Sequence, residues 1–225
     1  MDNVFTLYHG SDHVIETPLF GGGKRNNDYG QGFYCTANLE LAKEWSVYAI
    51  DRVGFVNAYE FDGTGLRILN LDRESILTWI AVLLNNRQFE MKGNLARAAF
   101  SYLSENFLVD YESYDVITGW RADDSYFAFA GDFINGAISV QQLEMAVKLG
   151  NLGVQYVMKS RESFRRLTFK EAIPVSSAYF AKRIRRDQEA RNSYLYGERE
   201  MFDKNELFIT DIMRQELKRD DARLQ

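Results

Sequence analysis

The sequence predicts an α+β fold, and three observations lead to this prediction. Strand patterns and helix patterns both occur over residues 1–175. They do not alternate strictly, so a doubly wound parallel sheet is not favoured. Residues 176–225 contain no proline and a single glycine, Gly197, and they are rich in charged residues. We therefore expect one mixed domain over residues 1–175 and a helical C-terminal extension over residues 176–225.

The predicted strands are short apolar or alternating runs that end at turn residues. They cover residues 4–8, 32–36, 54–62, 66–71, 114–119 and 154–159. Residues 17–32 are rich in Gly, Asn and Pro and predict a loop. Residues 170–175 lead into Pro174 and carry no assignment.

The predicted helices cover residues 38–49, 73–85, 94–106 and 139–149, and two more follow at about 177–196 and 199–219. Asn38 is a favourable N-cap, and Ser139 with Gln142 forms a capping-box pattern. Residues 120–125 are polar, and residues 126–131 form an aromatic stretch that we expect to be packed.

Composition excludes several classes of protein. The chain has 225 residues and a net charge of −5, whereas a general nucleic-acid binder usually has a basic balance. Its single cysteine, Cys35, cannot form an internal disulfide, which fits a reducing compartment. The N-terminus lacks the pattern of a signal peptide, and the longest apolar run, residues 76–84, is too short to span a membrane. We expect a soluble cytoplasmic protein.

The unusual residues of the chain are concentrated between Leu7 and Thr36. This stretch holds both histidines, the cysteine and six of the sixteen glycines. His9 stands at the end of a predicted strand, and Gly10 allows a ligand to approach the backbone closely. Tyr34 follows a glycine-punctuated turn and has a ring that can stack on a flat heterocycle. Together these features indicate a site for a nucleotide with a planar aromatic end.

Each half of this pattern has a plainer interpretation. An isolated His9 would more often be a hydrogen-bonded structural histidine, and Tyr34 alone would be a core aromatic residue. The spacing of the two and the intervening glycines favour a functional site. Lys24 and Arg25 in the loop between them could contact a phosphate group.

The two segments YHGS, residues 8–11, and DYGQGFYCT, residues 28–36, resemble the first two motifs of the ADP-ribosyltransferase fold in its diphtheria-toxin and poly-ADP-ribose-polymerase branch. The whole chain is similar to a bacterial family of uncharacterised ADP-ribosyltransferase-like proteins, whose genes often lie beside a small antitoxin-like partner. The likeness extends to VNAYEF at 56–61, GWRADDSYF at 119–127, VQYVMKS at 154–160 and ITDIMRQEL at 209–217. It implies a split antiparallel β-sheet core with flanking helices.

The resemblance also implies a binding site for NAD. His9 would hold a ribose hydroxyl on the nicotinamide side, the Gly10 backbone would bind the carboxamide, and Tyr34 would stack on the nicotinamide ring. Further residues implied to line this pocket are Ser11, Gly32, Phe33 and Thr36.

The third catalytic position of the fold is a glutamate, and here the aligned residue is Gln155. Glutamine can hydrogen-bond a hydroxyl, but it carries no charge and cannot act as a base. Either Gln155 orients the ribose or a carboxylate comes from Asp123 or Asp124. Arg121 could grip the pyrophosphate. Equally, Arg121 and these aspartates could form a loop ion pair and a helix cap.

The leading functional hypothesis is therefore an NAD-dependent mono-ADP-ribosyltransferase, the toxin of a bacterial toxin–antitoxin pair. NAD would be its substrate, a small antitoxin protein its partner, and its acceptor a protein side chain, a nucleic-acid base or a small molecule. The alternatives are a non-catalytic reader of NAD or ADP-ribose and an NAD glycohydrolase.

Other features favour structural roles. His9 and His13 lack a third ligand and make a poor metal site, and we expect no metal. We expect Cys35 to be a buried thiol with no catalytic role. The basic run 182–186 reads as a solvated helix in which Arg183 pairs with Asp187. The apolar face of residues 206–217 would pack on the enzyme body or dock a partner.

Overall fold

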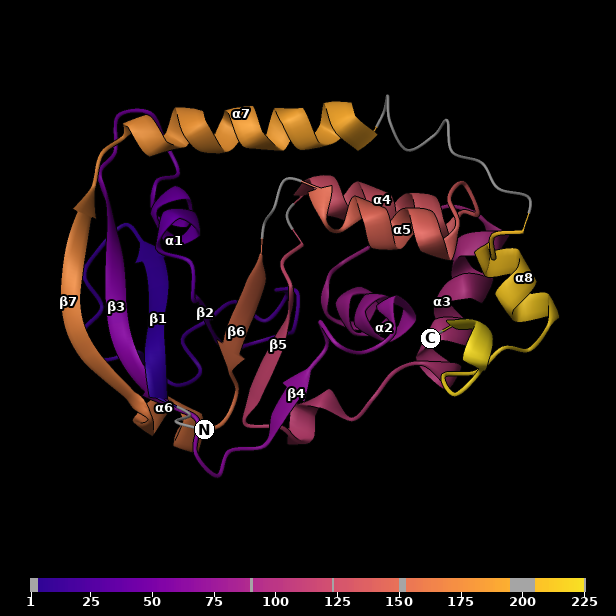
Figure 1. Ribbon diagram of the computed structural model, residues 1–225, viewed down its shortest axis with the longest axis horizontal. Helices are drawn as coiled ribbons and strands as arrows, with labels where there is room; N and C mark the ends of the chain where they lie inside the picture. The colour runs from indigo at the N-terminus through magenta and orange to yellow at the C-terminus, as the bar shows by residue number, and fades with distance from the viewer. Residues whose placement is uncertain (1–3, 90, 123, 150–152, 195–204, 225) are drawn as a thin grey trace.

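A computed structural model describes residues 4–89, 91–122, 124–149, 153–194 and 205–224 (Figure 1). It has a mixed α+β architecture, as the sequence predicts. The strands are β1 (Val4–Ser11), β2 (Phe33–Thr36), β3 (Gly54–Asp62), β4 (Ile68–Asn70), β5 (Val116–Trp120), β6 (Val154–Met158) and β7 (Leu167–Val175). The helices are α1 (Leu39–Ser46), α2 (Ile76–Asn86), α3 (Asn94–Asn106), α4 (Asp124–Ile134), α5 (Val140–Ala146), α6 (Arg161–Arg165), α7 (Ala178–Ser193) and α8 (Ile209–Arg214). In the described part of the chain, no helix is both long and apolar enough to cross a membrane.

The strands form one sheet in the order β4-β5-β6-β2-β1-β3-β7. Among these pairs only β4 and β5 run parallel, within the described residues. The central pair is weakly joined: β1 and β2 share a single paired position, Tyr8 opposite Thr36. By contrast, β1 pairs with β3 from Val4 to Ser11. The sheet is therefore forked between β1 and β2, and Figure 1 shows the two groups of strands on either side.

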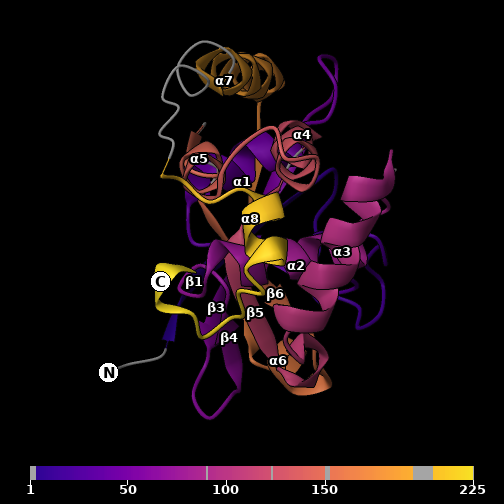
Figure 2. The same ribbon diagram turned by 90° about the vertical axis from the view of Figure 1, so that its right-hand side faces the viewer.

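Most of the helices cover the β4-β5-β6 side of the molecule. The largest hydrophobic cluster joins these strands to α2, α3, α4, α5 and α8, and every residue of α2 from Ile76 to Leu84 is buried. Figure 2 shows α8 lying beside α3. On the other side α1 packs on β1 and β3, and Tyr179 and Phe180 of α7 pack against the same small cluster. The helical tail thus lies on the mixed domain.

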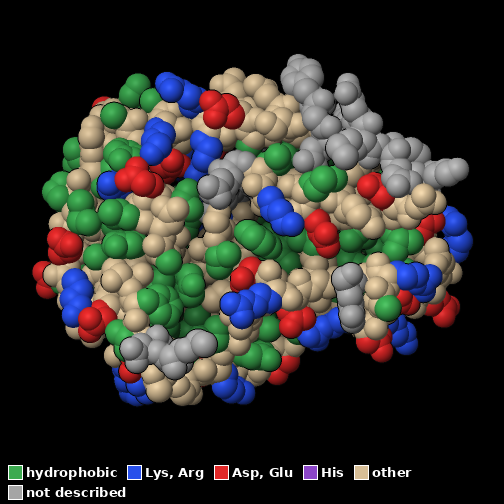
Figure 3. Space-filling view, in the orientation of Figure 1, with side chains coloured by type: hydrophobic (Ala, Val, Ile, Leu, Met, Phe, Trp, Pro, Cys, Tyr) green, Lys and Arg blue, Asp and Glu red, His purple; other side chains and the backbone are tan. Residues whose placement is uncertain are grey.

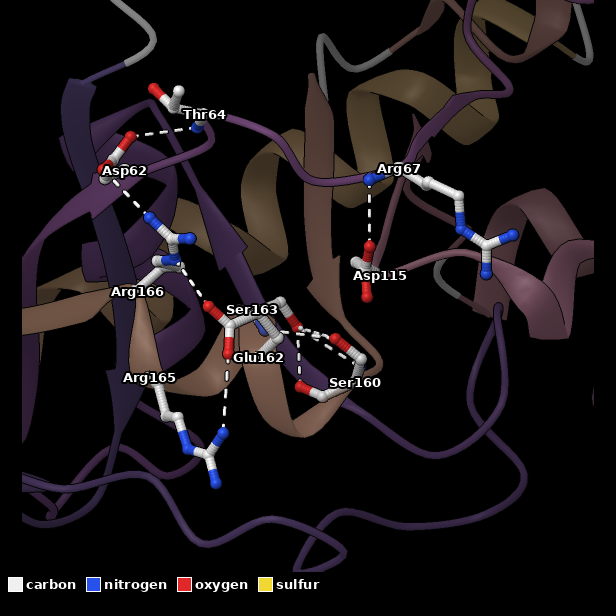
Figure 4. A network of polar contacts seen from close by, with 9 residues as sticks. All are labelled: Asp62, Thr64, Arg67, Asp115, Ser160, Glu162, Ser163, Arg165 and Arg166. Carbon is white, nitrogen blue, oxygen red and sulfur yellow. Dashed lines mark hydrogen bonds and ion pairs between the residues drawn. The ribbon is translucent and has the colours of Figure 1, made fainter.

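The connection from β6 to β7 is held by a polar network around α6. Ser160 and Ser163 form a capping box at its start. Arg166 bridges Glu162, at 2.9 Å, and Asp62 at the end of β3, at 3.3 Å (Figure 4). Across the surface seen in Figure 3, basic and acidic side chains are interspersed, in keeping with the absence of a basic balance in the sequence.

Several sequence predictions agree closely with the structure. The predicted bounds of β3 and α3 are those observed. Asn38 caps α1 by accepting hydrogen bonds from the backbone of Glu40 and Leu41. Ser139 and Gln142 form the predicted capping box at the start of α5.

Three predictions are corrected, and one segment without an assignment is placed. β1 continues beyond Tyr8 to Ser11, because β3 supplies pairing partners along its full length. The polar and aromatic stretches at 120–131 contain the start of helix α4, whose later residues Phe129 and Phe133 are buried. Residues 167–175 form β7, an edge strand. The second tail helix, predicted over 199–219, is the short α8 in the described residues, and 199–204 lie outside them.

Candidate functional site

A cleft of about 760 Å³ opens at the fork between β1 and β2. Its walls come from the end of β1, the loop over residues 13–23, the start of β2 and the start of β6. Trp45 of α1, Arg87 and the Arg121–Ala122 segment complete it. Ligand pockets in proteins usually measure about 300–1,000 Å³, so this cleft has the size of a small-molecule site.

His9 lies at the fork and is held in one tautomer. Its Nδ1 lies 2.6 Å from the carbonyl oxygen of Tyr34. Because a carbonyl only accepts hydrogen bonds, Nδ1 carries the proton. Burial lowers the pKa of His9, and the hydrogen bond to Tyr34 opposes this only in part. The ring is therefore neutral at pH 7 and its Nε2 keeps a free lone pair that can accept a hydrogen bond. The ring also stacks on Phe33, with centroids 4.3 Å apart.

Tyr34 lines the cleft with a ring that is anchored at its far end. Its hydroxyl donates to the carbonyl oxygen of Gly30 at 2.6 Å and accepts from the backbone N–H of Tyr29 at 3.0 Å. Burial raises the pKa of Tyr34, so its phenol stays protonated at neutral pH. Gly30 closes this loop with a φ of +76°, a conformation that favours glycine. The sequence motif thus ties the ring to its own loop.

Gln155 is the second residue of β6, is only 3% exposed and borders the cleft. Its cross-strand partners are Thr36 of β2 and Gly119 of β5. The side-chain Nε2 donates a hydrogen bond of 2.9 Å to Oδ2 of Asp28. Three predicted residues, His9, Tyr34 and Gln155, therefore border one cleft.

The sequence analysis did not select Asp28, nor Arg87, which lies beside it in the cleft wall. Asp28 is 5% exposed, and its carboxylate accepts from the backbone N–H of Ala122 at 3.0 Å and lies 3.5 Å from Nε of Arg87. Burial raises the pKa of Asp28, and the nearby Arg87 guanidinium opposes the shift. The sequence places Asp28 as the first residue of the DYGQGFYCT segment, but aspartate is common in turns, so its position did not indicate a role in the site.

The remaining residues implied by the resemblance divide into two groups. Gly32 and Phe33 border the cleft. Ser11 and Thr36 are not among the cleft-lining residues of the described chain. The Ser11 hydroxyl accepts from Nδ2 of the buried Asn57 at 2.9 Å, and Thr36 Oγ1 accepts from the Asn38 backbone at 3.1 Å. These two hydroxyls stabilise the loop after β1 and the start of α1.

Gly10 borders the cleft, but its missing side chain faces α1. A Cβ atom there would lie 2.2 Å from the carbonyl oxygen of Ala42 and 2.7 Å from the backbone nitrogen of Ser46. Glycine is therefore required here for the close packing of β1 against α1, whatever ligand its backbone contacts.

Arg121 borders the cleft and lies with its guanidinium carbon 4.5 Å from the centroid of the Trp45 ring. This stacking places a cation at the cleft wall. Asp123 lies outside the described residues. Asp124 begins α4, and its side chain is not among those described. The choice between these two aspartates and Gln155 therefore stays a prediction.

The features expected to be structural have clear places. His13 is exposed and pairs with Asp12 at 2.6 Å, and the described residues contain no cluster of potential metal ligands. Cys35 is fully buried, and burial raises the pKa of its thiol. Arg183 and Asp187 form the predicted i,i+4 ion pair at 3.8 Å. Ile209 and Ile212 of α8 are buried in the main core.

The cleft thus combines an acceptor on neutral His9, an anchored aromatic ring on Tyr34 and an amide on Gln155. Two arginines, Arg87 and Arg121, also border it. Hydrogen-bond acceptors of this kind suit sugar hydroxyls, the ring suits a planar heterocycle, and guanidinium groups suit phosphate.

Comparison with known sequences adds one match. No curated protein and no solved structure matches the chain. A family described as "Protein of unknown function (DUF3990)" matches residues 5–169, which include all the strands that form the cleft. Since the match covers more than half of the sequence, the chain belongs to the DUF3990 family.

Proposed function

We propose that this protein is an NAD-dependent mono-ADP-ribosyltransferase. The observation that carries the proposal is the cleft at the fork of the sheet, where His9, Tyr34 and Gln155 meet. These are the three positions to which the resemblance to the ADP-ribosyltransferase fold assigns catalytic roles. The forked, mostly antiparallel sheet supports the same split-sheet fold.

The proposed reaction breaks the bond between the nicotinamide nitrogen and C1′ of its ribose. The bonding electron pair leaves with nicotinamide, which departs as a neutral molecule, and positive charge develops on the ribose. A nucleophilic atom of the acceptor then bonds to C1′ and releases its proton to solvent. The enzyme must hold both rings and stabilise the developing charge.

Each cleft residue has a role in this scheme. His9 accepts a hydrogen bond from a ribose hydroxyl through Nε2, since its Nδ1 is occupied by the Tyr34 carbonyl. Tyr34 stacks on the nicotinamide ring, held in place by its anchored hydroxyl. Gln155 accepts from a second ribose hydroxyl. Arg87 and Arg121 border the cleft and would contact the pyrophosphate.

The resemblance further supports a cellular role as the toxin of a toxin–antitoxin pair, with a small antitoxin protein as partner. A second candidate function rests on Gln155: an uncharged residue in place of a glutamate favours a non-catalytic reader of NAD or ADP-ribose. An NAD glycohydrolase would use the same cleft with water as the acceptor.

The test is nicotinamide release from NAD by the purified protein, with His9→Ala and Gln155→Ala as site variants. Gln215→Ala is the matched control, because Gln215 is exposed and far along the chain in the tail. We expect release that falls about 100-fold in the His9 variant and is unchanged in the control. Label transferred from NAD to a macromolecule supports the transferase, and free ADP-ribose as sole product supports the glycohydrolase. Binding of NAD with no release under any acceptor condition would refute the enzyme and favour the reader.

A further inference from the structure

We propose that Asp28 is a positioning residue, whose carboxylate orients the Gln155 amide and supplies the negative charge that the glutamine lacks. In this arrangement an aspartate–glutamine pair performs the task of a single catalytic glutamate. The inference rests on the proposed function, since it concerns the stabilisation of charge at the same cleft.

The first step is the orientation of the amide. Gln155 Nε2 lies 2.9 Å from Asp28 Oδ2. The Arg87 guanidinium beside Asp28 and the Ala122 N–H that donates to it both favour the ionised carboxylate. An ionised carboxylate only accepts hydrogen bonds, so the nitrogen of the amide faces Asp28. This leaves the oxygen of the same amide as the group that can accept a hydrogen bond from a ligand hydroxyl. Without Asp28 the amide could turn and present a donor instead.

The second step is the location of the charge. Asp28 and Gln155 both border the cleft and are 5% and 3% exposed. The carboxylate stands one hydrogen bond behind the amide that would contact the ribose. Hydrogen bonds in a buried network polarise one another, so the charge strengthens the acceptor oxygen of the amide. Charge developing on the ribose would be stabilised through this pair.

The third step is the rigidity of Asp28. Its carboxylate also accepts from the Ala122 backbone at 3.0 Å and lies 3.5 Å from Arg87 Nε. These partners come from the segment after β5 and from the end of α2. The next residue, Tyr29, is fully buried and its hydroxyl donates to the Trp120 carbonyl at 2.5 Å. Asp28 is thus held from several directions, as a positioning residue requires.

The experiment compares nicotinamide release by wild type, Asp28→Asn, and the double variant Asp28→Asn/Gln155→Glu. The single change removes the charge and lets the two amides pair in either direction. The double change exchanges the acid and the amide, so that one negative charge is kept and now contacts the cleft directly. Asp220→Asn, at an exposed position outside the cleft, is the matched control. Thermal unfolding reports the folded state of each variant.

We expect Asp28→Asn to lower kcat about 10- to 100-fold, with KM changed less than about threefold, because the lost interaction acts in the transition state. The double variant should recover at least about tenfold of this loss. A folded Asp28→Asn with wild-type kcat would overturn the inference. A folded double variant that stays as slow as the single variant would also overturn it. If Asp28 had only a structural role, the exchanged pair would restore thermal stability without restoring kcat.

Two further outcomes are decisive. If the variants do not fold, a hydrogen-bond scalar coupling between the Gln155 side-chain nitrogen and the Asp28 carboxyl carbon, measured on wild-type protein with NAD bound, supports the pair, and its absence overturns it. If wild type releases no nicotinamide, the proposed function itself fails and the inference falls with it. If wild type is active and Asp28→Asn leaves kcat unchanged, the inference about Asp28 is refuted but the proposed function is not.

Discussion

The hydroxyl of Tyr34 provides a sharp test of how the cleft is built. Replacing Tyr34 with phenylalanine keeps the ring and removes only the oxygen. This oxygen donates to Gly30 at 2.6 Å and accepts from the Tyr29 backbone at 3.0 Å. We expect the variant to fold but to lose stability, because two backbone groups lose their partner.

The magnitude follows from these two bonds. Each intramolecular hydrogen bond contributes about 1 kcal/mol, and a buried polar group left without a partner costs about 1–3 kcal/mol. Tyr29 is fully buried, and Gly30 is also buried, so water has little access to either group. The ring stays in place, so no apolar burial is lost. The expected decrease in the free energy of unfolding is about 2–4 kcal/mol.

The assay is urea unfolding followed by tryptophan fluorescence. Tyr8→Phe is the matched control: Tyr8 is half-buried in the same sheet, and its hydroxyl makes no hydrogen bond to the described part of the chain. The control should lose less than about 0.5 kcal/mol. A Tyr34 variant as stable as the control would refute the claim that the loop anchors this ring.

Two other predictions follow from the same site. Gly10→Ala should lower the free energy of unfolding by about 2 kcal/mol or more, because the new Cβ would lie 2.2 Å from the Ala42 carbonyl oxygen. At Gly65 a Cβ atom would meet no atom within 4 Å, and only its φ of +77° disfavours alanine, so Gly65→Ala should lose about 1 kcal/mol in the same urea unfolding assay; equal losses would contradict the packing argument. Since burial lowers the pKa of folded His9 below its unfolded value of 6.5, its contribution to stability is present above pH 6.5 and declines as pH falls below it. Wild type should therefore lose more stability than His9→Asn between pH 7.5 and 5.5, and parallel profiles would count against a neutral buried His9.

The elements that the sequence predicted well carry their signals locally. β3 ends at an Asp-Gly turn, and α1 begins after Asn38, whose side chain accepts from two backbone N–H groups. The missed elements depend on tertiary surroundings. β7 contains Pro174, which argues against a central strand, but β7 is an edge strand that pairs with β3 alone. In α4 the buried residues Phe129, Ala130, Phe133 and Ile134 recur at helical spacing, and the sequence analysis treated this stretch only as an aromatic run.

The site was predictable to a similar degree. His9, Tyr34 and Gln155 were selected from their motifs, and all three border the cleft. Asp28 was not selected, because its role arises from a contact with Gln155 that spans 127 positions in the chain. From a single sequence, the hydrogen-bond partner of an aspartate in a turn cannot be predicted.

The fork in the sheet explains why so much unusual chemistry lies between Leu7 and Thr36. β1 and β2 diverge beyond the pair Tyr8 and Thr36, and the chain between them, residues 12–32, must cross the opening. That loop supplies the outer wall of the cleft, including Gly22 and Gly23, while the strands it joins supply the floor. A ligand bound at the fork therefore touches residues from one continuous stretch of sequence. Folding brings further residues to this cleft from later in the chain: Trp45, Arg87, Arg121, Ala122 and Gln155. The contact between Asp28 and Gln155, which no local motif predicts, depends on that step.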